Sequence, residues 1–337
     1  MAIQVNGTEV ISNSRALNNI ASIDATTAAA IGAAGVGGGT FGSVFYLGQG
    51  TYGIDLKGGT TNNTDIIVGG QQGNIYKSTD GVNFSNSGMG NTYPYEIFGM
   101  ARIGSKIVTS NSNGRIGVST NNGASFSASQ VTNVTADFLD IATDGSIFVT
   151  VTGYGHGRIY TTDGTTTTER LGYSGPGGRR FDAVAHNGSN LWLAGGVTEV
   201  SGTKTSIIAY SSNGTSWSTI TSGVVNRGQD IKSIAYGNGY WLVGYSNGDI
   251  IYSTNGTSWT YAGTVPQRIN DFAYNDGLWV GACGSGQIIT SEDPAGPWKA
   301  NVYSGVPNSR LVALPHSIGG VSSILVTGDN GYLQYTS

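Results

Sequence analysis

The chain has 337 residues, among them 55 glycines and 7 prolines, and only 11% of its residues are charged. This composition favours a turn-rich, all-β protein, and a formal net charge of -4 without any local Lys/Arg run argues against nucleic-acid binding. Cys283 is the sole cysteine and there are three histidines, so the sequence excludes an intramolecular disulfide and predicts neither a metal site nor a cofactor.

Residues 1–40 form the first predicted domain, a stem that ends in a glycine hinge at residues 37–39. Forty residues with few large side chains cannot build a core of their own. Val10, Ile11, Leu17 and Ile20 nevertheless keep an apolar pattern, which favours a structured segment over the alternative of a disordered leader. We therefore expect these four side chains to be buried in an oligomer or against another protein.

The rest of the chain repeats one phrase, in which an apolar run ends in Ser or Thr and is followed by a tight Asn/Asp/Gly turn and usually an aromatic residue. The anchoring Ser or Thr residues are Ser78, Ser119, Thr161, Ser211, Ser253, Ser291 and Thr336. By subtraction they lie 38 to 50 residues apart, which is the period of a four-stranded propeller blade.

The segment from Asp230 to Gly263 shows the order of strands within one repeat. Four β-type runs, IKSIAY, YWLVGY, DIIYS and SWTYA, are separated by Gly/Asn turns. Seven copies of the second run can be aligned along the chain. The sequence therefore predicts an all-β fold, a seven-bladed β-propeller of four-stranded blades over residues 41–337.

The last repeat ends at Ser337 after its third strand, which would leave a sheet edge without a partner. The apolar run from Ser43 to Leu47 directly precedes the first repeat and could fill that edge. We expect it to pair with the strand that ends at Tyr335. The first blade would then use Tyr52 to Leu56 as its innermost strand.

The repeated turns resemble the Asp-box of sialidase-like propellers, from about Ile66 to the end of the chain. Asn replaces the Asp of that motif in three copies, although both side chains can accept hydrogen bonds from backbone amides two residues on. The resemblance places these turns between the third and fourth strands, on the face away from the ligand. It implies a structural role for Asp80, Asn121, Asp163, Asn213, Asn255 and Asp293.

The phrases VNGTEVISNSRALNNIASID and ATTAAAIGAAG in the stem resemble the N-terminal segments of bacteriophage tail-fibre and other virion proteins. This likeness covers about a tenth of the chain. It implies that residues 1–40 attach to other virion proteins, that the chain is a homotrimer, and that the protein is located in the virion after assembly in the host cytoplasm.

The face opposite the Asp-box turns carries the turns between second and third strands, where arginines are concentrated. Arginine suits carboxylates and phosphates, and neighbouring aromatic and amide groups suit sugars. This pattern predicts a site for an acidic or phosphorylated glycan of the host surface. The alternative is a solvated rim with ion pairs such as Arg180 with Asp182. The predicted ligand-binding residues are Arg115, Arg158, Arg180, Arg227, Arg268, Arg310, Tyr95 and Tyr245.

A sialidase-like hydrolase would need a tyrosine nucleophile assisted by a glutamate and a separate acid/base residue. Tyr95 adjoins Glu96, but the Arg-Ile-Pro motif of that family is absent, and the five glutamates form no paired carboxylates at matching positions. We therefore predict that the protein is not an enzyme. Two hypotheses remain: a receptor-binding, tail-fibre-type virion protein, or a purely structural decoration of the head, neck or tail. Neither involves membrane insertion, because no stretch is long and apolar enough.

Overall fold

The computed structural model describes residues 3–5, 8–11, 45–46, 55–62, 64–81, 83–87, 95–153, 157–172, 177–302, 313–318, 321–329 and 332–335. The chain divides into two compact units, Met1–Thr40 and Phe41–Ser337. The first unit contains an antiparallel pair of strands, β1 (Ile3–Val5) and β2 (Thr8–Ile11). Val10 and Ile11 lie in β2, whereas Leu17 and Ile20 lie outside the described residues.

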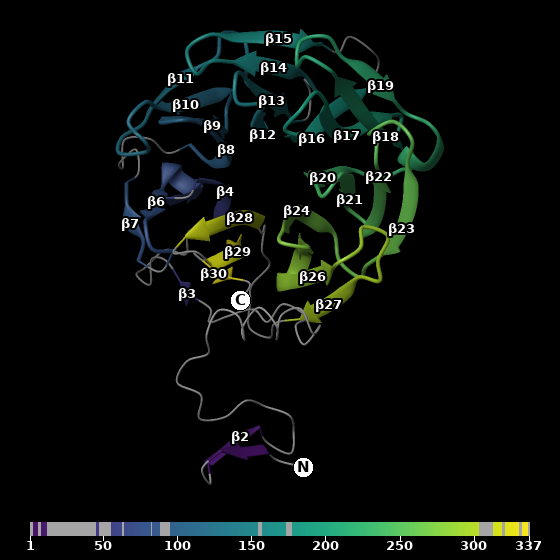
Figure 1. Cartoon of the computed structure of the whole chain (residues 1–337). Helices are drawn as coiled ribbons and strands as arrows, with labels where there is room; N and C mark the ends of the chain where they lie inside the picture. The colour runs from purple at the N-terminus through teal and green to yellow at the C-terminus, as the bar shows by residue number, and fades with distance from the viewer. Residues whose placement is uncertain are drawn as a thin grey trace. The chain divides into compact units, whose positions relative to one another are not determined.

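The second unit is a β-propeller whose four-stranded sheets surround a central opening (Figure 1). Six blades consist of four consecutive antiparallel strands each. Their strands are β4–β7 (Leu56–Thr61, Ile66–Gly70, Ile75–Ser78, Ser85–Asn86), β8–β11 (Ile97–Ile103, Lys106–Asn111, Arg115–Ser119, Ser127–Gln130), β12–β15 (Phe138–Thr143, Phe148–Thr152, Ile159–Thr162, Thr167–Leu171), β16–β19 (Gly178–His186, Trp192–Val200, Thr203–Ser211, Ser218–Ile220), β20–β23 (Ile231–Gly237, Tyr240–Tyr245, Asp249–Ser253, Thr260–Thr264) and β24–β27 (Ile269–Asn275, Leu278–Cys283, Gln287–Ser291, Lys299–Val302).

The remaining four-stranded sheet is composite. It combines β28 (Ala313–Ile318), β29 (Val321–Thr327) and β30 (Tyr332–Tyr335) with β3 (Phe45–Tyr46) from the start of the unit. The predicted fold class, a seven-bladed propeller, is therefore corrected in its blade count: six blades are made of consecutive strands. The physical reason is that the fourth strand of the last sheet, β3, comes from the start of the unit, whereas the other sheets pair strands that are consecutive in the chain.

The pairing that closes this sheet confirms the sequence prediction. Phe45 is opposite Leu333 and Tyr46 is opposite Tyr332 in an antiparallel register. The predicted innermost strand of the first blade, however, is shifted toward the C-terminus. It spans Leu56–Thr61, and residues 52–54 lie outside the described residues.

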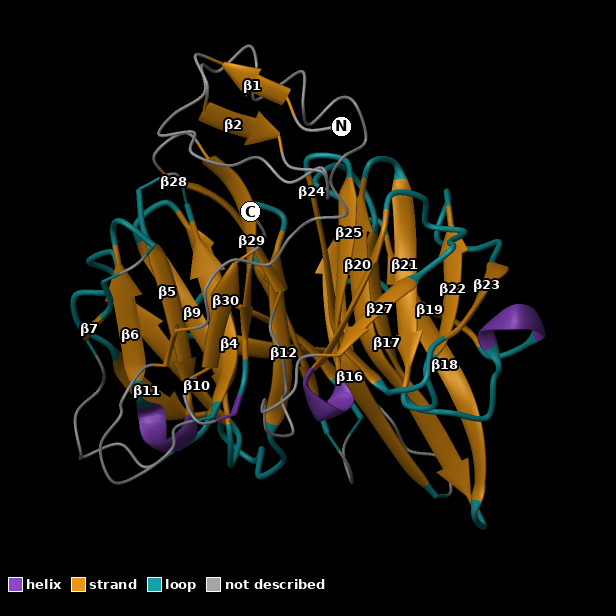
Figure 2. Ribbon diagram, turned by 90° about the horizontal axis from the view of Figure 1, so that it is seen from below, coloured by secondary structure: helices purple, strands orange, loops and turns teal. Residues whose placement is uncertain are grey.

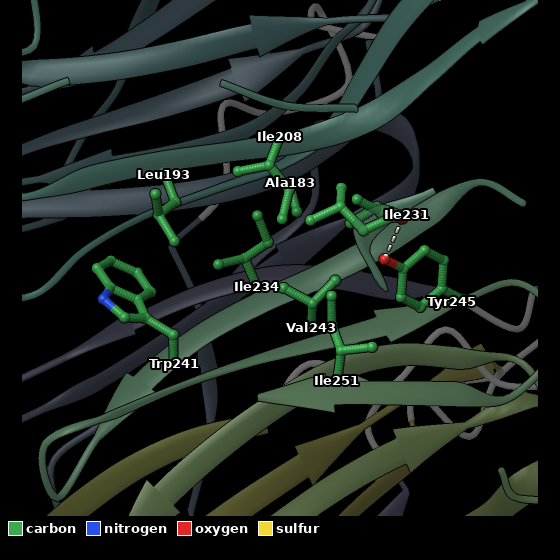
Figure 3. Packing of buried hydrophobic residues seen from close by; sticks show 10 residues of the cluster. Ala183, Leu193, Ile208, Ile231, Ile234, Trp241, Val243, Tyr245 and Ile251 are labelled. Atoms are coloured by element: carbon green, nitrogen blue, oxygen red, sulfur yellow. Dashed lines mark hydrogen bonds between the residues drawn. The ribbon is translucent and has the colours of Figure 1, made fainter. Parts of the chain in front are cut away.

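Neighbouring blades pack through apolar side chains, as Figure 3 shows for the blades β16–β19 and β20–β23. Leu193, Ile231 and Trp241 are at most 1% exposed in this cluster. Tyr245 is fully buried beside them and donates a hydrogen bond from its hydroxyl to the Val225 carbonyl oxygen at 2.7 Å. Burial of each large side chain stabilises the ring by about 1.5–3 kcal/mol.

The faces of adjacent blades approach so closely that small residues are required at some positions of the second strands. A Cβ on Gly244 would lie 2.6 Å from Ile269 Cγ2 in the next blade, and one on Gly195 would lie 2.4 Å from Ile231 Cγ2. Both distances are too short for real carbon contacts. Glycine therefore determines how tightly these blades pack.

The Ser/Thr turns between third and fourth strands have a common pattern of hydrogen bonds. Ser253 Oγ accepts a bond from the Gly256 amide at 2.8 Å, and Asn255 Oδ1 accepts one from the Ser258 amide at the same distance. In the third blade the hydroxyl that accepts is Thr162 Oγ1 rather than that of Thr161. These bonds satisfy turn amides and give the residues a structural role.

The turns between second and third strands occupy the other end of the propeller unit. Two of them contain short 3-10 helices, η1 (Gln71–Gly73) and η3 (Gly284–Gly286); a third, η2 (Gly223–Val225), follows β19. In Figure 2, β17 and β18 extend beyond neighbouring strands at this end. Cys283, at the end of β25, is fully buried, and this burial raises the pKa of its thiol to about 12.

Candidate functional site

The innermost strands of all six blades share one irregularity. In each, a buried apolar residue is paired with the second strand, the next residue is skipped, and pairing resumes one residue later. A bulge of this kind leaves one residue outside the ladder and re-aims its side chain. The buried residues that precede the bulge are Leu56, Ile97, Phe138, Phe181, Ile231 and Ile269.

The skipped residues line a cavity of about 440 Å³ in the centre of the ring. They are Lys57, Phe98, Leu139, Asp182, Lys232 and Asn270. Six bulges at equivalent positions therefore direct six different side chains toward one space. Propeller architecture thus gathers into one site residues that are far apart in the sequence.

One wall of this central cavity carries a cluster of ion pairs. Arg180 lies 2.8 Å from Asp182 and 2.7 Å from Asp230. Lys232 lies 3.1 Å from Asp182, and Lys204 lies 3.0 Å from Asp230. The Arg180 side chain is only 14% exposed, so this cluster is shielded from solvent far more than a surface ion pair. Burial raises the pKa of Asp182 and lowers that of Lys232.

Asp140 lines the same cavity. Its Oδ1 accepts a hydrogen bond from the Ile141 amide and its Oδ2 accepts one from the Val184 amide, both at 2.8 Å. Burial raises the pKa of this carboxyl to about 7, although the two amide bonds act in the opposite direction. Asp140 thus joins two neighbouring blades through the hydrogen bond of a titratable carboxyl group.

Four of the predicted arginines are held by partners close to them. Arg158 lies 2.8 Å from Glu169, and Arg227 lies 3.0 Å from Asp249. Arg227 also lies over the Tyr261 ring, with its Cζ 4.5 Å from the ring centroid. Arg115 is stacked in the same way on Tyr95, at 4.2 Å. The predicted pair of Arg180 with Asp182 is also present.

One further predicted ligand residue, Tyr245, does not lie on the rim. Tyr245 is fully buried in the core and hydrogen-bonded there, which corrects its prediction as a ligand contact. The reason is that Tyr245, the last residue of β21, packs in the apolar cluster between two blades. Arg310 lies outside the described residues.

Arg268 differs from the other predicted arginines. It is exposed, and no carboxylate among the described residues forms an ion pair with it. It lines the central cavity and also a second, more polar cavity of about 420 Å³. This second cavity lies between the blades β20–β23 and β24–β27, and its lining residues are Ser246, Asn247, Pro266, Gln267, Arg268, Gly284 and Ser285.

Local backbone structure explains the position of the Arg268 side chain. The Gly284 amide donates a hydrogen bond to the Arg268 carbonyl oxygen at 2.9 Å, which holds η3 against the start of β24. A Cβ on Gly284 would lie 3.2 Å from Arg268 Cγ, so the arginine stem lies over this glycine. Ser285 has a φ of 57°, which turns the chain sharply at the edge of the second cavity.

Sequence reasoning predicted Arg180 and Arg268 and named Asp182 only as an ion-pair partner of Arg180, and it missed Lys57 and Lys232. A signal was present, because the six innermost strands can be aligned on the apolar residue before the bulge. A charged residue precedes it in every blade: Asp55, Glu96, Asp137, Arg180, Asp230 and Arg268. Because a bulge shifts the side-chain alternation by one, the simple period of a strand did not reveal which residues face the cavity.

Across the part of the chain that the structure describes, no three His, Cys, Asp or Glu residues are grouped to hold a metal ion. Within the same residues there is also no helix of the length and apolarity that crossing a membrane requires.

Residues 174–332 match the family model described as the DUF6242 beta propeller domain, a match that covers less than half of the chain. No curated protein sequence matches the chain. Among solved structures, YCF48 from Cyanidioschyzon merolae is similar, with a TM-score of 0.64 and 14% identity over 88% of this chain and 98% of that one. A structure titled YCF48 bound to D1 peptide has a TM-score of 0.64 and 15% identity over 87% and 94%. Sqt1 from Saccharomyces cerevisiae has a TM-score of 0.57 and 12% identity over 89% and 99%. At these identities the likeness shows the fold alone: the chain contains a β-propeller domain.

Proposed function

We propose that the protein is a non-catalytic attachment protein of the virion tail-fibre type, in which residues 1–40 dock on the particle and the propeller binds an acidic glycan on the host surface. The stem phrases that resemble phage virion proteins support the first part. The exposed cationic group on the propeller face opposite the Ser/Thr turns supports the second.

The observation that carries the proposal is Arg268. Its guanidinium is exposed at the edge of a polar cavity and is not neutralised by any described carboxylate. Hydroxyl and amide groups of Ser285, Asn247 and Gln267 surround it. A guanidinium with neutral hydrogen-bonding neighbours is suited to a sugar that carries one acidic group.

The remaining predicted arginines support a smaller site than the sequence indicated. Arg158, Arg180 and Arg227 already have carboxylate partners at 2.7–3.0 Å, so binding an anion there would require breaking an existing ion pair. The glycan site is therefore centred on Arg268 rather than spread around the rim.

Binding without hydrolysis is supported by the partners of Tyr95 and Glu96, which are adjacent in the sequence. Glu96 lies 2.7 Å from Lys57, and the Tyr95 ring is covered by Arg115. A glutamate in an ion pair with lysine is a poor base for activating a tyrosine nucleophile. The proposal therefore assigns attachment and no glycosidase activity.

The test compares adsorption of the purified protein to host cells and to an array of neutral, carboxylated, sulfated and phosphorylated glycans. We expect Arg268→Ala to reduce binding at least tenfold, and Arg158→Ala, the matched control, to bind as the native chain does. Binding should weaken with salt. Equal binding by Arg268→Ala would overturn the glycan site, and release of free sugar would indicate a hydrolase.

The oligomeric state provides a separate test of the stem. Light scattering on the full chain and on residues 41–337 should give a trimer and a monomer, respectively, if Val10, Ile11, Leu17 and Ile20 are buried between chains. A monomeric mass for the full chain in the absence of other virion proteins, together with no binding to purified particles, would contradict the attachment role.

A further inference from the structure

We infer that the central cavity is a second binding site, and that its ligand is a small organic carboxylate that carries an apolar group. This site shares Arg268 with the glycan proposal, but it lies in a different cavity and is tested by different variants. The inference rests on the unequal chemistry of the two cavity walls and on the Arg268 guanidinium, which forms no ion pair with a described carboxylate.

The first wall is largely apolar, and its two charged residues are held by other groups: Lys57 by Glu96, and Asp140 by two backbone amides. It is formed by β4, β8 and β12, which contribute Phe98, Met100, Leu139 and Ile141 together with the bare backbone at Gly58 and Gly59. Phe98 and Leu139 are half-buried residues at bulge positions, so their side chains face the cavity instead of packing between blades. A ligand that covers apolar groups removes them from water, and this burial favours binding.

The second wall is charged. It is formed by β16, β20 and β24, which contribute Asp182 and Lys232 and, just before β24, Arg268. Figure 1 shows β4 and β8 on one side of the central opening and β20 and β24 on the other. A ligand that fills the cavity would therefore contact apolar groups at one end and charged groups at the other.

Every carboxylate of the cavity already has hydrogen-bond donors. Asp182 is paired with Arg180 and Lys232, and Asp140 accepts two backbone amides. Asp271 Oδ1 accepts a bond from the Phe272 amide at 2.8 Å. Arg268, in contrast, forms no ion pair with a described carboxylate. Arg268 is therefore a cation of the cavity lining that remains available to an anionic ligand.

These features select one ligand class. One unmatched guanidinium suits a singly charged carboxylate, whereas a phosphate dianion needs a second cation. A neutral sugar would leave Phe98 and Leu139 against polar groups, and a purely apolar ligand would desolvate Arg268 without compensation. The volume of about 440 Å³ lies within the range of small-molecule sites, roughly 300–1,000 Å³.

The test uses phenylacetate as the probe, with phenylacetamide and acetate as matched controls that lack the charge and the ring, respectively. Binding to the full chain is followed by calorimetry and by ligand-observed NMR. We expect phenylacetate to bind at least tenfold more tightly than either control. Phenylacetamide binding as tightly as phenylacetate, or the absence of phenylacetate binding at millimolar concentration, would overturn the inference.

Variants locate the probe within the molecule. Phe98→Ala and Leu139→Ala remove apolar contacts on different strands, and Arg268→Ala removes the cation, so each should weaken phenylacetate binding severalfold or more. Asn247→Ala, which changes only the second cavity, should leave it unchanged. Thermal unfolding identifies any variant that fails to fold. If either Phe98→Ala or Leu139→Ala fails, the other variant still tests the apolar wall.

The same variants separate this inference from the proposed function. An acidic glycan in the second cavity should respond to Asn247→Ala and not to Leu139→Ala, which is the reverse of the expectation for phenylacetate. Loss of phenylacetate binding in Asn247→Ala together with normal binding in Leu139→Ala would place the probe in the second cavity and overturn the central site.

Discussion

The Asp140 carboxylate accepts a hydrogen bond from the Val184 backbone amide at 2.8 Å, and these two residues belong to the innermost strands of neighbouring blades. The bond links β12 to β16 beside the central cavity. It places a group with a pKa of about 7 at a junction of the ring.

The first prediction concerns pH. Because the folded-state pKa of Asp140 is about 7 and the ordinary value is 3.8, the folded protein holds this proton over a range where the unfolded chain has released it. The unfolding free energy should therefore fall as pH rises from about 4 to about 7 and change little above that. Each unit by which the pKa differs between the folded and unfolded states changes the unfolding free energy by about 1.4 kcal/mol across this pH range.

Asp140→Asn should remove the contribution of this carboxyl to the pH dependence. In urea unfolding at several pH values, the unfolding free energy of the variant should fall less between about pH 4 and pH 7 than that of the native chain. Asp182 also has a raised pKa and contributes in the same direction, so some slope remains. A variant with the native slope would show that Asp140 titrates at its ordinary pKa.

The second prediction concerns the ion-pair cluster. Arg180→Ala removes one of the two cations that Asp182 and Asp230 share in a site of low exposure, and it should lower the unfolding free energy by about 1–3 kcal/mol. Arg158→Ala breaks an exposed pair and should cost at most about 1 kcal/mol. Equal losses in denaturant unfolding would mean that burial does not strengthen the cluster.

The third prediction concerns closure of the ring. A chain that begins at residue 41 keeps β3 and should unfold cooperatively. A chain that begins at residue 51 lacks β3 and leaves β30 as an open edge, so its melting temperature should fall and it should aggregate. Calorimetry on the two truncated chains distinguishes these outcomes, and matching transitions would show that β3 does not close the ring.

The fourth prediction concerns a turn. Ser253→Ala removes the acceptor of the buried Gly256 amide and should destabilise the protein by about 1–2 kcal/mol. Ser258→Ala, in the same turn, removes an exposed hydroxyl and should change the stability by less than about 0.5 kcal/mol. Thermal unfolding of both variants tests the difference, and a harmless Ser253→Ala would indicate that another group satisfies the amide.

The fifth prediction concerns contact between blades. Gly244→Val would force a Cβ to within 2.6 Å of Ile269 Cγ2 and should lower the unfolding free energy by about 1–3 kcal/mol or more. Ile269→Ala in the same chain removes the clashing methyl groups and should restore part of the loss. A double mutant no more stable than Gly244→Val would show that the strain arises elsewhere.

The sequence by itself determined the strands, their order within a repeat and the pairing of β3 with β30. These features depend on local patterns: apolar runs, Gly/Asn turns and a hydroxyl that accepts amides two or three residues on. The Ser253 turn and the segment from Ile231 to Thr264 follow directly from such patterns.

Only the tertiary structure decided the contents of the central cavity. Arg180 meets Asp230 across 50 residues of chain, and Asp140 meets Val184 across 44, because neighbouring innermost strands lie side by side in the ring. Bulges at equivalent positions then determine which side chain of each strand faces the cavity. The register between blades and the place of a bulge depend on packing between distant segments, which no local pattern records.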